Sequence, residues 1–244
     1  MSNIKEIAPD IFRISVYVSA SGLQFNQFLI RDEQPVLYHT GDRALFPEVL
    51  AAVNSLLDTS SLRWIGFSHF EGDECGSLNQ WLALASQAVP ITGVVAAATS
   101  INSYSDRTPR VLEDNATITT GRHTLRFLVT PHIPHNWESS LLYDESERVL
   151  FCSDLLLQRG DRPPTADDVL ERAVDDLEKA QRGPFHDSIP YTHATSRILA
   201  RLAELHPETL AVMHGASFRG DGASVLQKFD RALNRLFGTP TRSR

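Results

Sequence analysis

The sequence predicts an α/β fold from three observations. Short runs with the spacing of β-strands alternate along the chain with segments that have the spacing of amphipathic helices. Phe12, Ile14 and Val16 alternate with polar residues, as in a strand, whereas Leu78 and Leu82 stand four positions apart, as on one helix face. In addition, side chains that can bind a metal follow several of the strand-like runs, which is where α/β proteins place their ligands.

The first half of the chain is expected to contain five strands, each a short apolar or alternating run. They are residues 11–18, 25–30, 35–38, 64–67 and 91–96. The first three are expected to form an antiparallel meander, because residues 31–34 make a polar turn between the second and the third. Amphipathic helices are expected over residues 46–57, with Asp42 as the N-cap, and over residues 78–85.

The second half repeats this alternation of strands and helices. Its expected strands are residues 117–119, 124–129, 139–143, 148–152 and 210–213. The third and fourth of these are expected to form a hairpin around the acidic turn 144–147. One helix is expected after Thr165 and Asp168, which resemble a capping box, and two more over residues 198–205 and 225–236.

Composition sets limits on the domain organisation, the partners and the location of the protein. The chain has 244 residues, of which 42% are hydrophobic, and we expect residues 1–244 to form a single domain. A formal net charge of −7 without a basic run argues against a nucleic-acid partner. No apolar stretch reaches the roughly 18–20 residues of a membrane span, and the N-terminus lacks the pattern of a secretory signal. Cys75 and Cys152 do not make a disulfide framework, so we expect reduced thiols in a cytoplasmic protein.

The turn after residues 64–67 carries a dense group of titratable side chains. His69, Glu71 and Asp73 alternate there, and Glu74 follows directly. Alternate residues of an extended segment point the same way, so the first three side chains can converge on one point. A solvated acidic turn would also explain this stretch taken alone, and the choice depends on the rest of the chain.

Three further predicted strands lead into side chains that bind metals. His135 lies in the loop after residues 124–129, Asp154 follows the second strand of the hairpin, and His214 follows the last strand. One histidine at a strand end is a weak signal, because structural histidines are common. Four strand ends that all carry oxygen or nitrogen donors predict a site for divalent metal ions.

This layout resembles the metallo-β-lactamase superfamily over nearly the whole chain. The resemblance implies an αββα sandwich, in which two mixed β-sheets pack face to face with helices on the outer faces and metals at one end. Hydrolytic members usually carry His-x-His-x-Asp-His where this chain has His69, Glu71 and Asp73. Glutamate at the second position is similar to the di-iron branch, which includes flavodiiron proteins and oxygen-binding di-iron proteins without a flavodoxin domain.

The resemblance also implies the ligands of two iron ions. They are His69, Glu71 and His135 for the first ion, Asp73 and His214 for the second, and Asp154 as the bridge between them. The pattern of the branch ends in histidine where this chain has Glu74. Glu74 either binds the second metal, leaves that metal with fewer ligands, or supports the start of the following helix.

The charge of the donor set favours iron over zinc. Glu71, Asp73 and Asp154 contribute three negative charges, or four with Glu74, and oxygen donors suit hard ions such as iron and manganese. Zinc or manganese is expected as a substitute, because metal supply also decides occupancy. A bridging carboxylate would hold the ions roughly 3.5–4 Å apart, as in two-metal sites.

Two residues are candidates for a catalytic role beside the ligands. One is Glu74. The other is His132, which precedes His135 by three positions. The role of His132 is left open between hydrogen bonding near the metals, acting as a base toward a substrate, and lying in a solvated loop.

The resulting hypothesis is a non-haem di-iron protein that binds dioxygen and reduces dioxygen or nitric oxide, or that acts as an oxygen sensor. The sequence contains no flavin motif, so the electrons would come from a separate donor protein or from the substrate. The resemblance to flavodiiron proteins implies a homodimer. One alternative is a binuclear metal-dependent hydrolase of small esters, lactones, thioesters or phosphoesters. Another is oxygenation of an organic substrate, which a deep apolar pocket beside the metals would favour.

Overall fold

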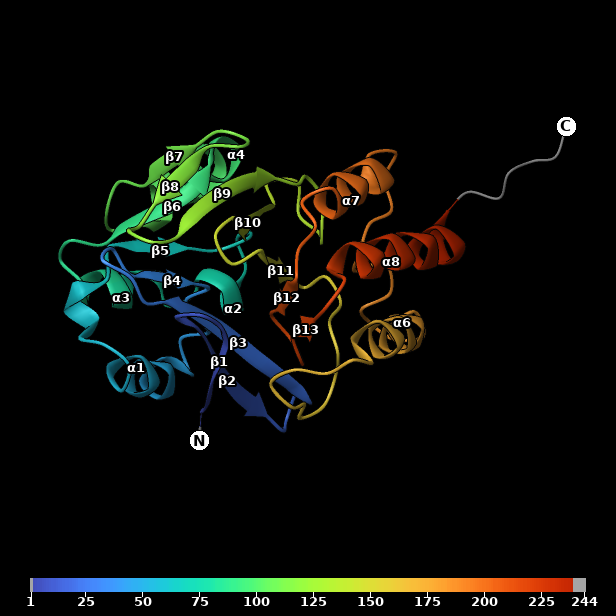
Figure 1. Cartoon of the computed structure of the whole chain (residues 1–244), viewed down its shortest axis with the longest axis horizontal. Helices are drawn as coiled ribbons and strands as arrows, with labels where there is room; N and C mark the ends of the chain where they lie inside the picture. Colours follow the sequence, from blue (N-terminus) through green and yellow to red (C-terminus); the bar gives the residue numbers. More distant parts are fainter. Residues whose placement is uncertain (1, 239–244) are drawn as a thin grey trace, which may run out of the picture.

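The computed structural model describes residues 2–238, which fold into four layers (Figure 1). Two β-sheets lie face to face, and helices cover the outer face of each. Both sheets contain parallel and antiparallel strand pairs. The predicted αββα sandwich of two mixed sheets is therefore confirmed.

Within residues 2–238, the first sheet has seven strands, which lie in the order of the sequence. They are β1 (Asn3–Ala8), β2 (Ile11–Val18), β3 (Leu23–Ile30), β4 (Val36–Tyr38), β5 (Trp64–Gly66), β6 (Val89–Gly93) and β7 (Arg110–Leu112). The pairs from β1 to β4 are antiparallel, and those from β4 to β7 are parallel. The predicted meander is thus present as β2, β3 and β4, with β1 as an additional strand.

Within the same residues, the second sheet has six strands in the order β13-β12-β11-β10-β9-β8. They are β8 (Thr117–Thr119), β9 (Thr124–Val129), β10 (Ser140–Asp144), β11 (Val149–Ser153), β12 (Thr209–Val212) and β13 (Phe218–Arg219). The predicted hairpin is the antiparallel pair of β10 and β11. The next pair, β11 and β12, is parallel, so both strands end on the same side of the sheet.

Helices flank both sheets. They are α1 (Phe46–Asn54), α2 (Gly72–Cys75), α3 (Leu78–Leu84), α4 (Val94–Ala96), α5 (Asn102–Tyr104), α6 (Val169–Ala180), α7 (Thr195–Ala203) and α8 (Gly222–Phe237), with a 3-10 turn at Thr59–Ser61 and a π-helical turn at Ala97–Ile101. α1 and α3 bury their apolar faces against the first sheet, and α6, α7 and α8 bury theirs against the second.

The alternation of side chains along a strand explains how one sheet packs against helices on one face and against the other sheet on its opposite face. In β11, Leu150 and Cys152 pack against the outer helices, whereas Val149 and Phe151 fill the space between the sheets. Successive side chains of a strand point to opposite faces, so a strand buried on both faces is apolar throughout. All five residues of β11 are buried.

Two predictions of helix caps were wrong, although the first helix starts at residue 46 as expected. α1 begins at Phe46, with Pro47 in its first turn, because proline has no N–H to lose there and its fixed φ suits a helix start. Asp42 instead accepts a hydrogen bond from the N–H of Ala44 within the preceding turn. Asp168 precedes α6 but makes no capping hydrogen bond, because its carboxylate pairs with Arg172.

The predicted strand over residues 91–96 was wrong at its end. The strand stops at Gly93, which pairs with the last residue of β7, Leu112. The next residues form α4, where Val94 and Val95 are 56% and 41% exposed. The strand preference of valine depends on packing against neighbouring strands, and this sheet offers no partner beyond Leu112 in β7.

A buried polar contact joins the two sheets at one end. The N–H of Asn26, on β3, donates to the carbonyl oxygen of Met213, just after β12. The side-chain amide of Asn26 donates to the carbonyl oxygens of Val212 and Gly215. The fully buried Arg13, on β2, also donates to the carbonyl oxygen of Gly215. These bonds fix the loop that carries the predicted ligand His214.

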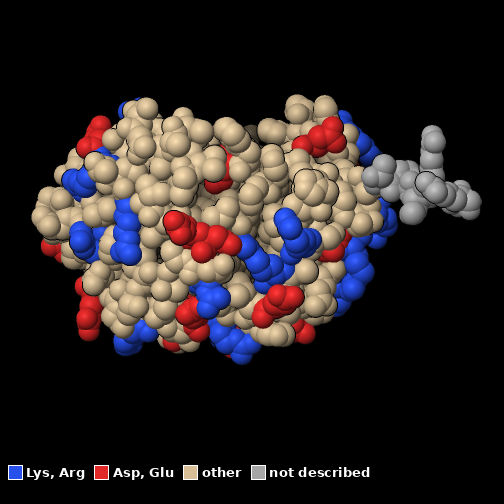
Figure 2. Space-filling model, turned by 90° about the horizontal axis from the view of Figure 1, so that it is seen from above, with Lys and Arg blue, Asp and Glu red and all other residues tan. Residues whose placement is uncertain are grey.

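The surface is of mixed charge. On the face that Figure 2 shows, acidic and basic side chains are interspersed, and no broad basic area is seen. No helix among residues 2–238 is both long enough and apolar enough to cross a membrane.

Candidate metal centre

The predicted ligands meet at one end of the sandwich, because each follows a strand that ends there. His69 comes after β5, His135 after β9, Asp154 directly after β11 and His214 shortly after β12. β5 belongs to the first sheet and the other three strands to the second. The centre is therefore built at the seam between the sheets.

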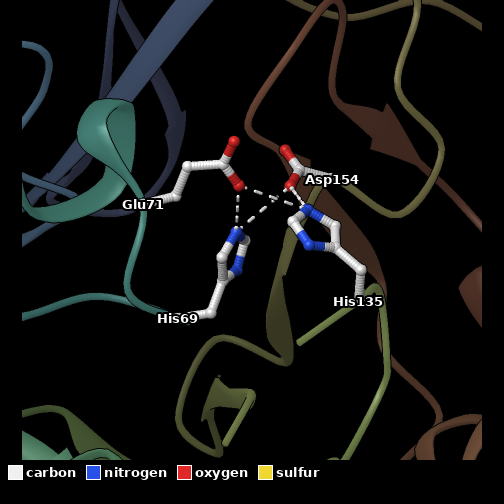
Figure 3. Close-up of side chains that lie close together, drawn as sticks. All are labelled: His69, Glu71, His135 and Asp154. Atoms are coloured by element: carbon white, nitrogen blue, oxygen red, sulfur yellow. Dashed lines mark hydrogen bonds and ion pairs between the residues drawn. The ribbon is translucent and has the colours of Figure 1, made fainter. Parts of the chain in front are cut away.

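One side of the centre contains His69, Glu71, His135 and Asp154, whose donor atoms lie within 4.8 Å of one another (Figure 3). The Nε2 atom of His69 lies 3.1 Å from Oε2 of Glu71 and 3.5 Å from Oδ2 of Asp154. The Nε2 atom of His135 lies 2.8 Å from the same Asp154 oxygen. The four side chains thus point their donor atoms at one small volume.

The other side of the centre contains Asp73 and His214. The Nε2 atom of His214 lies 3.2 Å from Oδ2 of Asp73 and 3.1 Å from Oδ1 of Asp154. The two oxygens of Asp154 therefore face different groups of donors. This is the geometry that a carboxylate needs to bridge two cations.

Glu74 lies within the centre. Its side chain is 0% exposed, one oxygen lies 3.5 Å from Nε2 of His69, and neither oxygen has a hydrogen-bond partner among residues 2–238. It also lies within 4.8 Å of the donor atoms of Glu71 and Asp73. Burial and the charge of Asp154 raise the pKa of Glu74 well above its ordinary value. A buried carboxylate without donors requires a cation or a proton.

The charges of the site fit bound cations. Burial alone would lower the pKa of His135 and of His214, but the hydrogen bonds to Asp154 outweigh it and raise the two values to about 9 and about 10. The same bonds hold the pKa of Asp154 well below its usual range although burial opposes this. The carboxylates thus draw positive charge into a buried site, and metal ions can supply that charge in place of the two protons.

Hydrogen bonds from outside the cluster orient two of the three imidazoles, those of His69 and His214. The Nδ1 atom of His69 lies 3.0 Å from the hydroxyl oxygen of Ser68, which lies 2.7 Å from that of Ser153. The Nδ1 atom of His214 lies 2.7 Å from the carbonyl oxygen of Gln24. Such partners fix the ring so that Nε2 faces the metal position. Sequence spacing gave no sign of them, since Ser68 and Ser153 are 85 positions apart.

The loop of His135 is tied to the turn of His69. The carboxylate of Glu138, itself buried, accepts a hydrogen bond of 3.0 Å from the N–H of Phe70. The Nδ1 atom of His135 lies 3.1 Å from the side-chain oxygen of Asn136, which has a φ of 60°. A residue other than glycine at positive φ is uncommon and is found at functional sites more often than elsewhere.

Two other histidines of the region lie apart from the donor groups. His132 has a φ of 63° and is half-buried, but it belongs to neither group of donor atoms found among residues 2–238. Its predicted catalytic role remains a prediction. His39, after β4, is fully buried, and burial lowers its pKa to about 3, so its ring is neutral.

The cysteines are buried thiols. Cys75 and Cys152 are both free. Burial raises the pKa of Cys75 to about 12 and raises that of Cys152 further. Because the thiolate is the reactive form, both behave as inert core residues.

Comparisons with known proteins agree with this fold. Rubredoxin-oxygen oxidoreductase of Megalodesulfovibrio gigas is 25% identical over 209 residues, which are 83% of this chain and 51% of that protein. The anaerobic nitric oxide reductase flavorubredoxin of Klebsiella pneumoniae is 26% identical over 225 residues, which are 89% of this chain and 46% of that protein. The chain thus spans about half the length of these relatives.

Solved structures share the fold at lower identity. The rubredoxin oxygen:oxidoreductase of Desulfovibrio gigas matches with a TM-score of 0.76 and 19% identity, covering 94% of this chain and 61% of that chain. The flavodiiron protein of Giardia intestinalis matches with a TM-score of 0.76 and 18% identity, covering 94% and 59%. The statistical model of the family described as ODP family beta lactamase matches residues 23–215. This match covers well over half of the sequence, and the chain therefore belongs to that family.

Proposed function

We propose that this protein is a non-haem di-iron protein that binds dioxygen and reduces dioxygen or nitric oxide, or acts as an oxygen sensor. The observation that carries the proposal is Asp154, whose two oxygens face separate groups of donors. The names of the relatives support these small molecules, since they include a rubredoxin-oxygen oxidoreductase and an anaerobic nitric oxide reductase, and the name of a structural neighbour, a flavodiiron protein, supports iron. Zinc and manganese remain expected substitutes.

The donors divide into two sets in this proposal. They are His69, Glu71 and His135 for one iron, Asp73 and His214 for the other, and Asp154 for both. Glu74 lies near both sets, since one of its oxygens is 3.5 Å from Nε2 of His69 and its donor atoms lie within 4.8 Å of those of Glu71 and Asp73. We assign it to the second iron, because the pattern of the di-iron branch has a ligand of that iron at this position. When bound, the iron pair would supply electrons and open coordination positions for dioxygen or nitric oxide.

The protein's own part is to hold this geometry and to keep charges balanced. Ser68 and the carbonyl oxygen of Gln24 fix two of the imidazoles, so that little reorganisation is needed when the oxidation state changes. The carboxylates stabilise the more oxidised and more positive metal state, which favours electron transfer to a bound gas molecule. His132 lies on the loop that carries His135, and we keep it as a candidate for hydrogen bonding near the metals or for acting as a base toward a substrate.

The partners and the assembly are part of the proposal. We infer that electrons come from a separate donor protein or from the substrate, and that two copies of the chain form a homodimer. A single domain over residues 1–244 and a cytoplasmic location complete it. Without an electron donor, the protein would use the same site to bind oxygen as a sensor.

The carboxylate content speaks against the hydrolase alternative. A zinc hydrolase of this superfamily relies mainly on imidazoles, whereas Glu71 stands at a position where those enzymes usually have histidine. The two relatives named above, an oxygen oxidoreductase and a nitric oxide reductase, are oxidoreductases. A hydrolase of esters, lactones, thioesters or phosphoesters is therefore the second choice.

Metal analysis and a gas-mixing experiment test the proposal together. Protein purified without added metal should contain about two iron ions per chain, as a two-metal site requires. After anaerobic reduction, mixing with dioxygen should produce a change in absorbance. If a reductase is added to resupply electrons, the protein should consume dioxygen over many turnovers instead of one. Two zinc ions together with esterase activity would instead identify the hydrolase.

A further inference from the structure

A cavity of about 710 Å³ opens beside the candidate metal centre. Its lining includes the predicted ligands Glu71, Asp73, His135, Asp154 and His214. Other walls come from the turn between β2 and β3, from the loop after Asp154, from α6, from residues 185–189 and from α8. The metal positions thus face an internal space rather than bulk solvent alone.

The walls away from the metals are mostly apolar. On α6, Ala173, Leu177 and Ala180 line the cavity, at positions that fall on one stripe of the helix. The two alanines leave space that longer side chains at these positions would fill. Ile189, on the segment after α6, and Phe229, on α8, add further apolar surface.

The size of this cavity exceeds what the proposed gases require. A molecule of dioxygen or nitric oxide is comparable in size to water, whose share of liquid volume is about 30 Å³. A cavity of about 710 Å³ falls within the roughly 300–1,000 Å³ that is usual for sites of organic ligands. An apolar space of this kind points to an organic molecule beside the metals.

Arg159 gives the cavity a positive group. This residue lines the cavity, and no residue in the described part of the chain forms a hydrogen bond or ion pair with its guanidinium. The nearest acidic wall residue, Asp176, is buried and accepts a hydrogen bond of 2.7 Å from the main-chain N–H of Arg159. Asp176 is therefore engaged with the backbone of Arg159, while the guanidinium stays available to a ligand.

We propose that this cavity binds an amphipathic organic anion, with its apolar body against α6 and Phe229 and its carboxylate on Arg159. A planar guanidinium with several donors matches a carboxylate in shape and charge. The apolar body gains free energy by leaving water for the stripe of Ala173, Leu177 and Ala180. This site adds an organic ligand to the gas molecules of the proposed function.

Calorimetric titration of the metal-loaded protein with four probes tests the chemistry of the ligand. Decanoate should bind roughly tenfold or more tightly than decanol, which has the same chain without the charge. Acetate, which has the charge without the chain, should show no measurable binding. Decylammonium should bind more weakly than decanoate. Tighter binding of decylammonium would overturn the proposal, because it would assign the polar contact to Asp176.

Variants test the place of binding. Arg159→Gln should weaken decanoate binding about tenfold and leave decanol binding unchanged. Arg172→Gln, on the outer side of α6, is the matched control and should change neither. Ala173→Phe should weaken both probes, since it fills the space beside Leu177. Because Arg159→Gln changes a loop side chain without a partner, it keeps the test valid even if Ala173→Phe fails to fold.

The outcomes separate this proposal from the proposed function. Equal decanoate binding by wild type and Arg159→Gln would overturn the anion site, because the carboxylate would then bind elsewhere, such as at the metals. The titration uses no dioxygen, so a protein that fails to react with dioxygen can still support the anion site. Conversely, if the anion site is disproved, the proposed function is still tested separately by the metal content and by the reaction with dioxygen.

Discussion

Asp154 is the residue on which the two sides of the metal centre depend. It follows Ser153, which has a φ of 52°, and the strand register with β12 shifts between Phe151 and Ser153. A positive φ at such a residue costs roughly 1–3 kcal/mol, so it persists only where surrounding contacts hold it. Here the hydroxyl of Ser153 is held by that of Ser68, and the chain leaves the sheet with the Asp154 carboxylate between His135 and His214.

Replacing this residue tests the bridge. Asp154→Ala should remove both metal ions, because the carboxylate serves each of them, and iron per chain should fall from about two to near zero. Elemental analysis measures this directly. Asp167→Ala, which removes an exposed carboxylate, is the control and should keep both ions. If Asp154→Ala retained one ion, the bridging role would be rejected.

Glu74 is tested by a change of ligand type. Glu74→His should keep two metals but alter the iron absorption spectrum, because an imidazole replaces a carboxylate oxygen at the metal. Glu171→His, on the exposed side of α6, serves as the control. A spectrum identical to that of the wild type would place Glu74 outside the coordination sphere.

At the scale of elements, a buried ion pair joins β9 to β10. β9 leads into the loop that carries His135, and β10 is the first strand of the hairpin. The Nδ1 of His123, just before β9, donates to Asp144 at the end of β10 at 2.5 Å. Burial disfavours the charged imidazole, but this hydrogen bond and the charge of Asp144 outweigh it and raise the pKa of His123. The pair therefore joins β9 to β10 and favours the protonated form of the imidazole.

This pair predicts a dependence of stability on pH. Because the folded protein holds the His123 proton more tightly than the unfolded chain, its contribution is complete below the unfolded pKa of about 6.5 and is lost as pH rises through the folded value. His123→Gln should cost about 1.5–3 kcal/mol near pH 6 and less near pH 9. Urea unfolding of both proteins measures this difference. His186→Gln, an exposed histidine, should show neither effect, and a cost that grows with pH would contradict the assignment.

At the scale of the whole molecule, the metal centre joins the two sheets. Donors on the β5 side belong to the first sheet, and Asp154 and His214 belong to the second, so bound ions would cross-link both halves of the sandwich. Without ions, the charge of a buried carboxylate such as Glu74 is not compensated, and this lowers the stability of the folded state. Binding to the folded state alone stabilises it.

Metal removal should therefore destabilise the whole protein. Stripping the ions with a chelator should lower Tm, and restoring free metal to a hundredfold excess over its Kd should return about 2.7 kcal/mol per site. Thermal unfolding of stripped and reloaded protein measures this. Asp154→Ala provides the control, since its Tm should not respond to added metal. An equal response of both proteins would show that the ions act elsewhere.

The sequence determined the features that depend on local spacing. The alternation of Phe12, Ile14 and Val16 fixed the bounds of β2, and the strand-end positions of His135 and His214 indicated a shared edge. Prediction from local spacing was wrong where the neighbouring strand determines the structure. Val94 is an example, because this strand-forming residue starts a helix at the point where β7 ends. The pattern of the predicted metal ligands was likewise readable along the chain, since those residues stand in short motifs.

Only the tertiary structure decided which groups surround those ligands. Ser68 meets Ser153, and Gln24 meets His214, across 85 and 190 positions, and no local rule links such distant residues. The cavity with Arg159 arises in the same way, from a loop, two helices and the segment after α6 that close around one space. The spacing of apolar and polar residues determines which face of a helix or strand is apolar. Burial and charge compensation in the folded molecule determine which distant residues pack against that face.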